Sequence, residues 1–352
     1  MNVLTFATLA AKPGVFKSMT GISTQEFEAL LARVGPRSEA LIRSRIERAD
    51  RQRAPGGGEK SSHDLTERLL MTLVWLRLYL TCEAVGFLFG VDKGTVSRFT
   101  RPILLILRDL GVETLGWPDE AITLAQSADA GVLLATPTGS VPEEPAVASD
   151  VEDTDATDRT GIGTPDEARC GDHVAIIDAT EQRVERPGDS DTQKTYYSGK
   201  KKAHTLKTQI VVNERGRMRQ VSDSVPGATH DLTLLRQSGV VAALPRGVTA
   251  NGDCGYRGMQ NDFPDHSVAL PYRPNAGQHL TPEEKLHNQI VSSVRIVVEN
   301  TLAELKHFQA LASRFRHSLE RHSEVIKAIV GIVNRRIDQR LANLPIPCST
   351  TT

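Results

Sequence analysis

The spacing of apolar residues changes about halfway along this chain of 352 residues. In the first part, apolar residues recur every three or four positions, which is typical of helices that bury one face. This spacing predicts a series of helices over 24–34, 38–53, 64–80, 83–89 and from 92 onward. Gly35 follows the first of them and is a predicted helix stop. The amino-proximal part is therefore expected to be all-α.

A different pattern begins after residue 173. Residues 174–177 form a continuous apolar run, typical of a strand buried on both faces, and this strand is predicted to end at Asp178. Further strands are predicted over 206–212, 216–224, 248–251 and 266–272. Two amphipathic helices follow, one beginning at Pro282 after a Thr281 cap and one beginning at Glu320. The second part is therefore expected to be an α/β domain.

The helix over 83–89, Gly90 and the helix that begins near Asp92 have the rhythm of a helix-turn-helix. In that motif the second helix enters the major groove of DNA and the first crosses the phosphate backbone. Four polar residues of the predicted second helix are candidates for DNA contact: Lys93, Thr95, Ser97 and Arg98. Because ordinary helical bundles also contain two helices joined at a glycine, the pattern alone leaves a purely structural role open.

Charge is unevenly distributed along the chain. The formal net charge is −1, which does not suit a DNA-binding protein, yet residues 37–53, 200–207 and 314–340 are basic. The balance comes from residues 143–172, which are strongly acidic and overlap a stretch over 127–170 that is rich in Ala, Pro, Thr, Asp and Glu. Such a composition buries little apolar surface, so residues 113–172 are predicted to be a disordered acidic linker.

Cysteine usage and hydropathy limit the class of protein. The four cysteines lie far apart and form no CxxC pair, so neither a zinc site nor a disulfide framework is expected. The sequence shows no signal peptide and no apolar run long enough to span a membrane. A cytoplasmic protein without a membrane partner is expected.

Three carboxylates are the candidate chemical groups. Asp178 lies at the predicted end of the first strand, Asp253 follows the strand 248–251, and Glu299 lies on the helix that begins at Pro282. Two divalent ions about 3.5–4 Å apart can activate the attacking oxygen and stabilise the leaving oxygen of a phosphoryl displacement, and hard cations bind oxygen ligands. The three acids therefore suggest a two-metal site. An ion pair of Glu299 with neighbouring cations of its helix remains an alternative.

Five sequence blocks resemble, in order, those of the DDE transposases of the insertion-sequence-five and Harbinger-related group. The blocks are IIDATEQRVERP, YYSGKKKAHTLKTQIVV, VPGATHDLTLLR, NGDCGYRG and RIVVENTLAELKHFQALASRFR. The resemblance covers roughly Val174 to His317 and implies a ribonuclease-H-like fold. It also implies Mg²⁺-dependent cutting and joining of DNA, with two ions bound and Mn²⁺ as a substitute. The long acidic segment departs from the family's pattern.

On the matching positions, the resemblance assigns Asp178, Asp253 and Glu299 as catalytic acids and metal ligands. Asp231, in the third block, also matches and is the alternative second acid, although it suits a helix cap equally well. Three lysines of the second block are either solvated or neutralise DNA phosphates beside the metal site: Lys200, Lys201 and Lys202.

These observations predict five parts. They are a tail over 1–20, an all-α helix-turn-helix domain over 21–112, the linker 113–172, a ribonuclease-H-like DDE domain over 173–342 and a tail over 343–352. The expected function is a DNA transposase that binds the terminal inverted repeats of its element and target DNA. It is expected to act as a homo-oligomer on DNA and to associate with the nucleoid. A domesticated DDE nuclease and a helix-turn-helix regulator without transposition remain alternatives.

Overall fold

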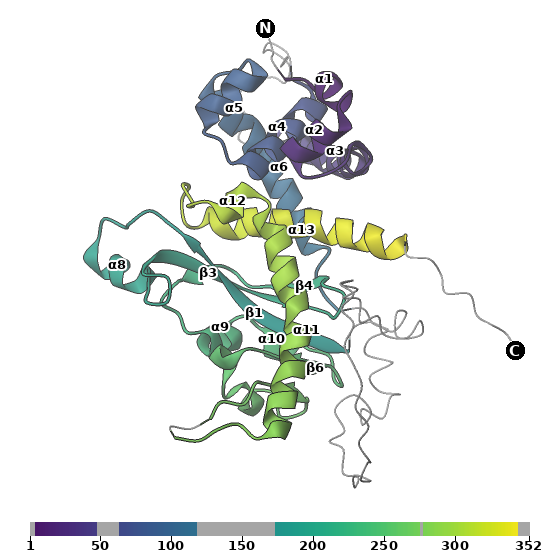
Figure 1. Ribbon diagram of the computed structural model, residues 1–352. Coiled ribbons are helices and arrows are strands. Elements are labelled where there is room, and N and C mark those ends of the chain that lie inside the picture. Colours follow the sequence, from purple (N-terminus) through teal and green to yellow (C-terminus); the bar gives the residue numbers. More distant parts are fainter. Residues whose placement is uncertain (1–3, 48–62, 118–172, 275–276, 344–352) are drawn as a thin grey trace, which may run out of the picture.

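The computed structural model describes residues 4–47, 63–117, 173–274 and 277–343 (Figure 1). The predicted linker and the predicted carboxy-terminal tail lie almost entirely outside these ranges. Among the helices that are described, none has both the length and the apolar character needed to cross a bilayer.

The amino-proximal domain, at the top of Figure 1, is helical. Its helices are α1 (Phe6–Ala10), α2 (Pro13–Thr20), α3 (Thr24–Ile46), α4 (Leu65–Leu78), α5 (Cys82–Phe89) and α6 (Lys93–Val112). Phe6, Phe16 and Phe27 form an aromatic cluster with ring centroids 4.9–5.9 Å apart. Residues 1–20, expected to be a tail, thus contribute α1 and α2 to this domain, because the fully buried Phe16 anchors them in its core.

Helix α3 runs without a break, whereas the sequence predicted a stop at Gly35. Val34, directly before the glycine, is fully buried, and Arg37, shortly after it, donates to the Glu113 carboxylate. Packing on both sides of Gly35 therefore holds the helix through a glycine and Pro36, two residues that disfavour helix interiors.

Helices α5 and α6 confirm the predicted helix-turn-helix. Gly90 ends α5 in the left-handed conformation with a φ of 66°. Asp92 caps α6 by accepting hydrogen bonds from the backbone N–H groups of Gly94 and Thr95, at 2.8 and 3.0 Å. A Cβ at Gly86 would lie 2.4 Å from the Val91 carbonyl oxygen, so the turn packs too closely against α5 for any larger residue.

The second domain is built on a mixed sheet. Its strands are β1 (Val174–Arg183), β2 (Tyr197–Ser198), β3 (Ala203–Val212), β4 (Met218–Val221), β5 (Val225–Pro226), β6 (Thr249–Asn251) and β7 (Val268–Ala269). The strand order is β2-β3-β1-β6-β7, with β4 and β5 also paired to β3. β1 is antiparallel to β3 and parallel to β6. This α/β domain is consistent with a ribonuclease-H-like fold.

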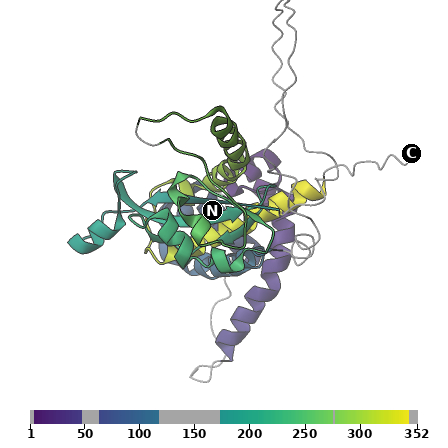
Figure 2. The ribbon, with the colours of Figure 1, turned by 90° about the horizontal axis from the view of Figure 1, so that it is seen from below.

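Helices cover both faces of the sheet. The helices of this domain are α8 (Ser190–Tyr196), α9 (Asp231–Gln237), α10 (Val240–Ala243), α11 (Pro282–Lys306), α12 (Gln309–Ala312) and α13 (Arg321–Ala342), with 3-10 turns η1 (Cys254–Tyr256) and η2 (Met259–Asn261). Ile176 belongs to the core on the side of α11 and α13, and Ile177 to a smaller core with Leu235, Val240 and Tyr256. Seen from below, α11 and the hairpin bearing α8 project from the body in different directions (Figure 2).

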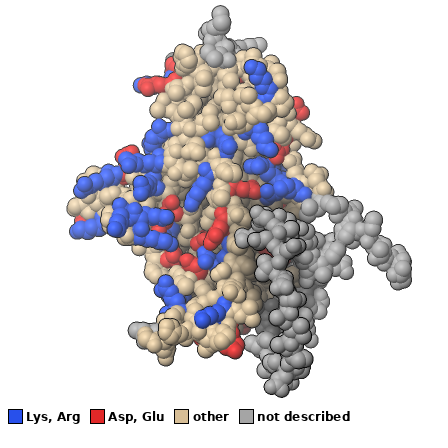
Figure 3. Space-filling view, viewed as in Figure 1, with Lys and Arg blue, Asp and Glu red and all other residues tan. Residues whose placement is uncertain are grey.

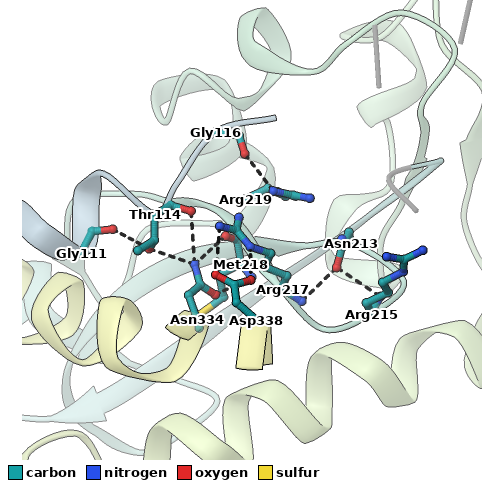
Figure 4. Close-up of polar contacts among 10 residues, drawn as sticks. All are labelled: Gly111, Thr114, Gly116, Asn213, Arg215, Arg217, Met218, Arg219, Asn334 and Asp338. Carbon is teal, nitrogen blue, oxygen red and sulfur yellow. Dashed lines mark hydrogen bonds and ion pairs between the residues drawn. The ribbon is translucent and has the colours of Figure 1, made fainter. Parts of the chain in front are cut away.

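Helix α13 joins the two domains because it packs along α6 and also against the sheet (Figure 1). The buried Asn334 side chain is the centre of this joint (Figure 4). Its Nδ2 donates to the Met218 carbonyl oxygen at 2.9 Å and to the Thr114 hydroxyl at 3.0 Å, and its Oδ1 accepts from the Met218 N–H at 3.0 Å. One side chain thus ties the segment after α6 to strand β4.

Candidate active site

Asp178 lies within β1 rather than at its end, because the strand continues to Arg183 in register with β3. Its side chain faces α11, where an Arg295 guanidinium nitrogen lies 3.7 Å from Oδ2. Burial raises the pKa of Asp178, and the negative charge of Asp253 raises it further, while the Ala179 N–H and Arg295 act in the opposite direction. The net effect is a raised pKa, because desolvation outweighs the nearby positive charge of Arg295.

Asp253 follows β6, as predicted. Its Oδ1 accepts the Gly255 N–H at 2.7 Å and so closes the η1 turn. In the parallel register of β1 and β6, Ile176 is opposite Asn251. Asp178 lies two residues after Ile176, and Asp253 lies two residues after Asn251. Two neighbouring strands therefore carry Asp178 and Asp253 at equivalent positions, which explains why the charge of Asp253 acts on the pKa of Asp178.

Glu299 lies on α11, one turn after Arg295, and its side chain is exposed. Arg295 pairs with Asp178 and not with Glu299, so the ion pair considered for Glu299 is not formed. Within the described residues, no group of three or more His, Cys, Asp or Glu side chains is arranged to hold a metal ion. The structure thus brings Asp178 and Asp253 together and places Glu299 on the helix that faces them, without assembling a three-acid cluster.

Asp231, the alternative second acid, is the first residue of α9, where His230 is the cap. Its Oδ1 accepts a hydrogen bond from the Lys207 ammonium at 2.8 Å. The sequence groups Lys207 with the lysines of a basic stretch, but this residue is only 7% exposed. Its burial depends on an acid 24 residues later in the chain, so no local pattern could indicate it.

Two buried polar atoms beside the acids lack hydrogen-bond partners: the Tyr256 hydroxyl and the Asn251 Oδ1. Burial raises the pKa of Tyr256 well above its usual range, and the charges of Asp231, Asp178 and Asp253 raise it further. A divalent cation with its water shell would offer both charge and hydrogen-bond partners here. Mg²⁺ binds proteins through as few as one or two carboxylates together with substrate phosphates, so the donor set of Asp178 and Asp253 fits it.

On the face shown in Figure 3, Lys and Arg side chains gather over the hairpin bearing α8, and acidic side chains lie nearer the centre. Lys200, Lys201 and Lys202 form the exposed turn between β2 and β3. The positive charge of Lys200 lowers the pKa of Asp178, which places this turn within electrostatic reach of the acids. DNA phosphates approaching the acids would therefore meet these lysines.

On α6, the four predicted DNA-contact residues lie in the first two turns. Lys93 pairs with Glu83 at 3.3 Å, and both side chains are more than 70% exposed. Arg98 donates to the Thr95 hydroxyl at 2.6 Å and lies 3.9 Å from Asp92. Ser97, between Thr95 and Arg98 in the sequence, is exposed. The sequence did not indicate that Glu83 and Asp92 would engage the two cations.

Comparisons with known proteins agree with both domains. Residues 177–334 match the family model of the DDE superfamily endonuclease, and residues 64–113 match that of the helix-turn-helix of DDE superfamily endonuclease. The chain is 25% identical over 320 residues to the probable transposase for insertion sequence element IS702 of Microchaete diplosiphon, covering 91% of this chain and 93% of the relative. No solved structure matches. The two matches, in this order, are those of an endonuclease domain of the DDE superfamily behind its helix-turn-helix domain, and the likeness to a transposase extends along nearly the whole chain.

Proposed function

We propose that this protein is a DNA transposase, which cuts and joins DNA at a divalent-metal site held by Asp178 and Asp253, with Glu299 as the third acid. The observation that supports the site most directly is the placement of Asp178 in β1 and of Asp253 two residues after the end of the adjacent parallel strand β6, at equivalent positions in the register, with burial raising the pKa of Asp178. A partly buried carboxylate whose charged form is disfavoured by desolvation gains from a bound cation, so it is suited to bind a metal ion. Mg²⁺, as two ions, with Mn²⁺ as a substitute, is the proposed cofactor.

The metal would supply activation of the attacking oxygen and stabilisation of the leaving oxygen. The protein groups have complementary tasks. Arg295 lies 3.7 Å from Asp178 Oδ2 and restrains that carboxylate from the α11 side. Lys200, Lys201 and Lys202 neutralise backbone phosphates and so hold the scissile strand near the acids. Water is the first nucleophile, and the freed 3′-hydroxyl of the element end then attacks target DNA.

The helix-turn-helix domain recognises the terminal inverted repeats in this proposal. Lys93, Thr95, Ser97 and Arg98 project from the start of α6, the end that enters the major groove in such motifs. We further propose that the protein belongs to the insertion-sequence-five and Harbinger-related group, acts as a homo-oligomer on DNA and associates with the nucleoid in the cytoplasm.

A strand-cleavage assay tests the function. DNA carrying the element ends is incubated with Mg²⁺ and with wild type, Asp178→Asn or Asp253→Asn. Each variant should lose cleavage by a factor of about 10² or more, since the lost charge is needed in the transition state. Asp265→Asn, at an exposed position, is the control and should cut normally. Folded variants of both acids that retain wild-type cleavage would refute the proposed site and favour a regulator without nuclease activity.

A further inference from the structure

Lys207 is an unusual residue because its charged end is buried. The side chain is 9% exposed and lies on β3, directly opposite Glu181 of β1 in the antiparallel register. Its ammonium donates to the Thr229 carbonyl oxygen at 2.7 Å and to Asp231 Oδ1 at 2.8 Å, and Glu181 Oε1 is 3.7 Å away. All of these partners are internal, so this lysine is not a solvated surface cation.

The second oxygen of Asp231 faces the turn that bears Asp253. A Cβ at Gly255 would lie 2.7 Å from Asp231 Oδ2 and 2.9 Å from Asp253 Oδ1. The Gly255 backbone is therefore held between the two carboxylates, and its N–H donates to Asp253. Asp231 thus packs against the η1 turn, and the hydrogen bond from Lys207 fixes the position of Asp231.

A buried ion pair is poor evidence for added stability, because desolvation of both charges offsets their attraction. Such pairs are better explained by the geometry that they impose. Removing one partner leaves an uncompensated buried charge, whereas removing both is often tolerated. This asymmetry gives the pair a signature that can be measured.

We propose that Lys207 and Asp231 are positioning residues: the Lys207 ammonium binds Asp231 and fixes it as the support of the turn that bears Asp253. The inference rests on the proposed function, in which Asp253 is a metal ligand. It assigns the two matching acids of the third and fourth sequence blocks to different tasks. Asp253 binds the ion, and Asp231, paired with Lys207, orients Asp253.

Metal binding in the absence of DNA provides the first test. Calorimetric titration with Mn²⁺ should show at least a tenfold loss of affinity for Asp253→Asn. Lys207→Met, which leaves Asp231 charged and unpaired, should also weaken binding several-fold, and the double variant Lys207→Met/Asp231→Asn should recover most of that loss. The surface pair Arg236–Asp262, 2.9 Å apart at α9, supplies the control, so Asp262→Asn should bind Mn²⁺ normally.

Cysteine substitution separates a ligand from a support. Thiolates bind Mn²⁺ better than Mg²⁺, so Asp253→Cys should be inactive with Mg²⁺ and partly restored by Mn²⁺, whereas Asp231→Cys should be impaired equally with both. Mn²⁺ rescue of Asp231→Cys, or unchanged Mn²⁺ affinity in Lys207→Met, would overturn this inference alone. Unchanged Mn²⁺ affinity in Asp253→Asn would overturn the proposed function and, with it, the inference.

Discussion

Gly111 of α6 and Gly331 of α13 touch through their backbones where the two helices cross. A Cβ at Gly331 would lie 2.4 Å from the Gly111 Cα, and a Cβ at Gly111 would lie 1.9 Å from the Lys327 carbonyl oxygen. No side chain separates the helices at this point, so the crossing sets how the DNA-binding domain sits on the catalytic domain.

Gly331→Ala should therefore be destabilising by about 1–3 kcal/mol or more, because the added methyl meets backbone that cannot move aside cheaply. Thermal or denaturant unfolding would measure this change. Gly35→Ala is a matched control: it also lies inside a helix, nothing lies within 4 Å of the added methyl, and it should be neutral or slightly stabilising. Equal effects of the two substitutions would show that the crossing is not close-packed.

Replacing Lys93 and Arg98 together by Ala should weaken binding to the terminal repeats while leaving nonspecific metal-dependent nicking largely intact. Their ion pairs are exposed and contribute little to stability, so the domain should stay folded. Binding measured against salt concentration should show a smaller slope, by about one for each phosphate that the variant no longer neutralises. Lys12→Ala/Lys17→Ala, at exposed positions of and beside α2, is the control. A matching loss of nicking would place α6 in the catalytic machinery.

Asp178→Asn should stabilise the metal-free protein near neutral pH. Because burial raises the pKa of Asp178, its ionised form is less favourable in the folded than in the unfolded chain. Wild type should gain stability as the pH falls through that raised pKa, and the variant should lack this gain. Mg²⁺ should raise the melting temperature of wild type and have little effect on the variant. A variant that Mg²⁺ still stabilises fully would remove Asp178 from the ligand set.

Glu299→Gln tests the third acid. If Glu299 is a metal ligand in the complex with DNA, the variant should still fold and bind DNA, while its rate of cleavage falls by about two orders of magnitude or more. If it is a solvated residue of α11, the change should cost roughly 0–1 kcal/mol of stability and almost no activity. Glu283→Gln, exposed in the first turn of the same helix, is the matched control. Near-normal cutting by Glu299→Gln would exclude it as a catalytic acid.

His322 makes the joint between β1 and α13 sensitive to acid. Its Nε2–H donates to the Gln182 side-chain oxygen at 2.7 Å, and its Nδ1 accepts from the Ser224 hydroxyl at 2.6 Å. Burial lowers the pKa of His322 to about 4. The folded chain therefore keeps this ring neutral, and stability should be lost as the pH falls from about 6.5 toward 4, by about 3 kcal/mol in all.

This acid sensitivity can be isolated by unfolding experiments at a series of pH values. His322→Gln should be less stable than wild type at neutral pH, yet its stability should fall less steeply in this window. His307→Gln, at an exposed position, should keep the wild-type slope. An unchanged slope in His322→Gln would show that other groups control the acid response.

The local signals in the sequence were sufficient for the elements and for part of the site. The capping box of Thr281 and Glu284 begins α11 where predicted, and the apolar run at 174–177 forms the buried half of β1. The rest of β1 was missed because Gln182 is polar yet buried, donating to the Ala310 and Ser313 carbonyl oxygens more than 120 residues away. Hydrophobic spacing carries no information about such partners.

The same limit applies to the site. The position of Asp253 after a strand follows from local pattern, whereas the pairing of Lys207 with Asp231 and that of Arg295 with Asp178 depend on how distant elements pack. Glu299 could be placed on its helix, but its relation to Asp178 depends on the angle at which α11 crosses the sheet. Sequence alone therefore indicated the acids and not the cations that hold them.

The joint at α13 also has a consequence for synthesis. About two hundred residues separate the end of α6 from the start of α13. At typical rates of about 5–20 residues per second, the ribosome therefore needs roughly 10–40 s to reach the start of α13. During that interval helices α5 and α6 have already been synthesised, but the crossing of α6 with α13 has not formed. The position of the helix-turn-helix relative to the acids is therefore fixed only once α13 has been made, so the proposed cutting of DNA has to wait for the whole chain.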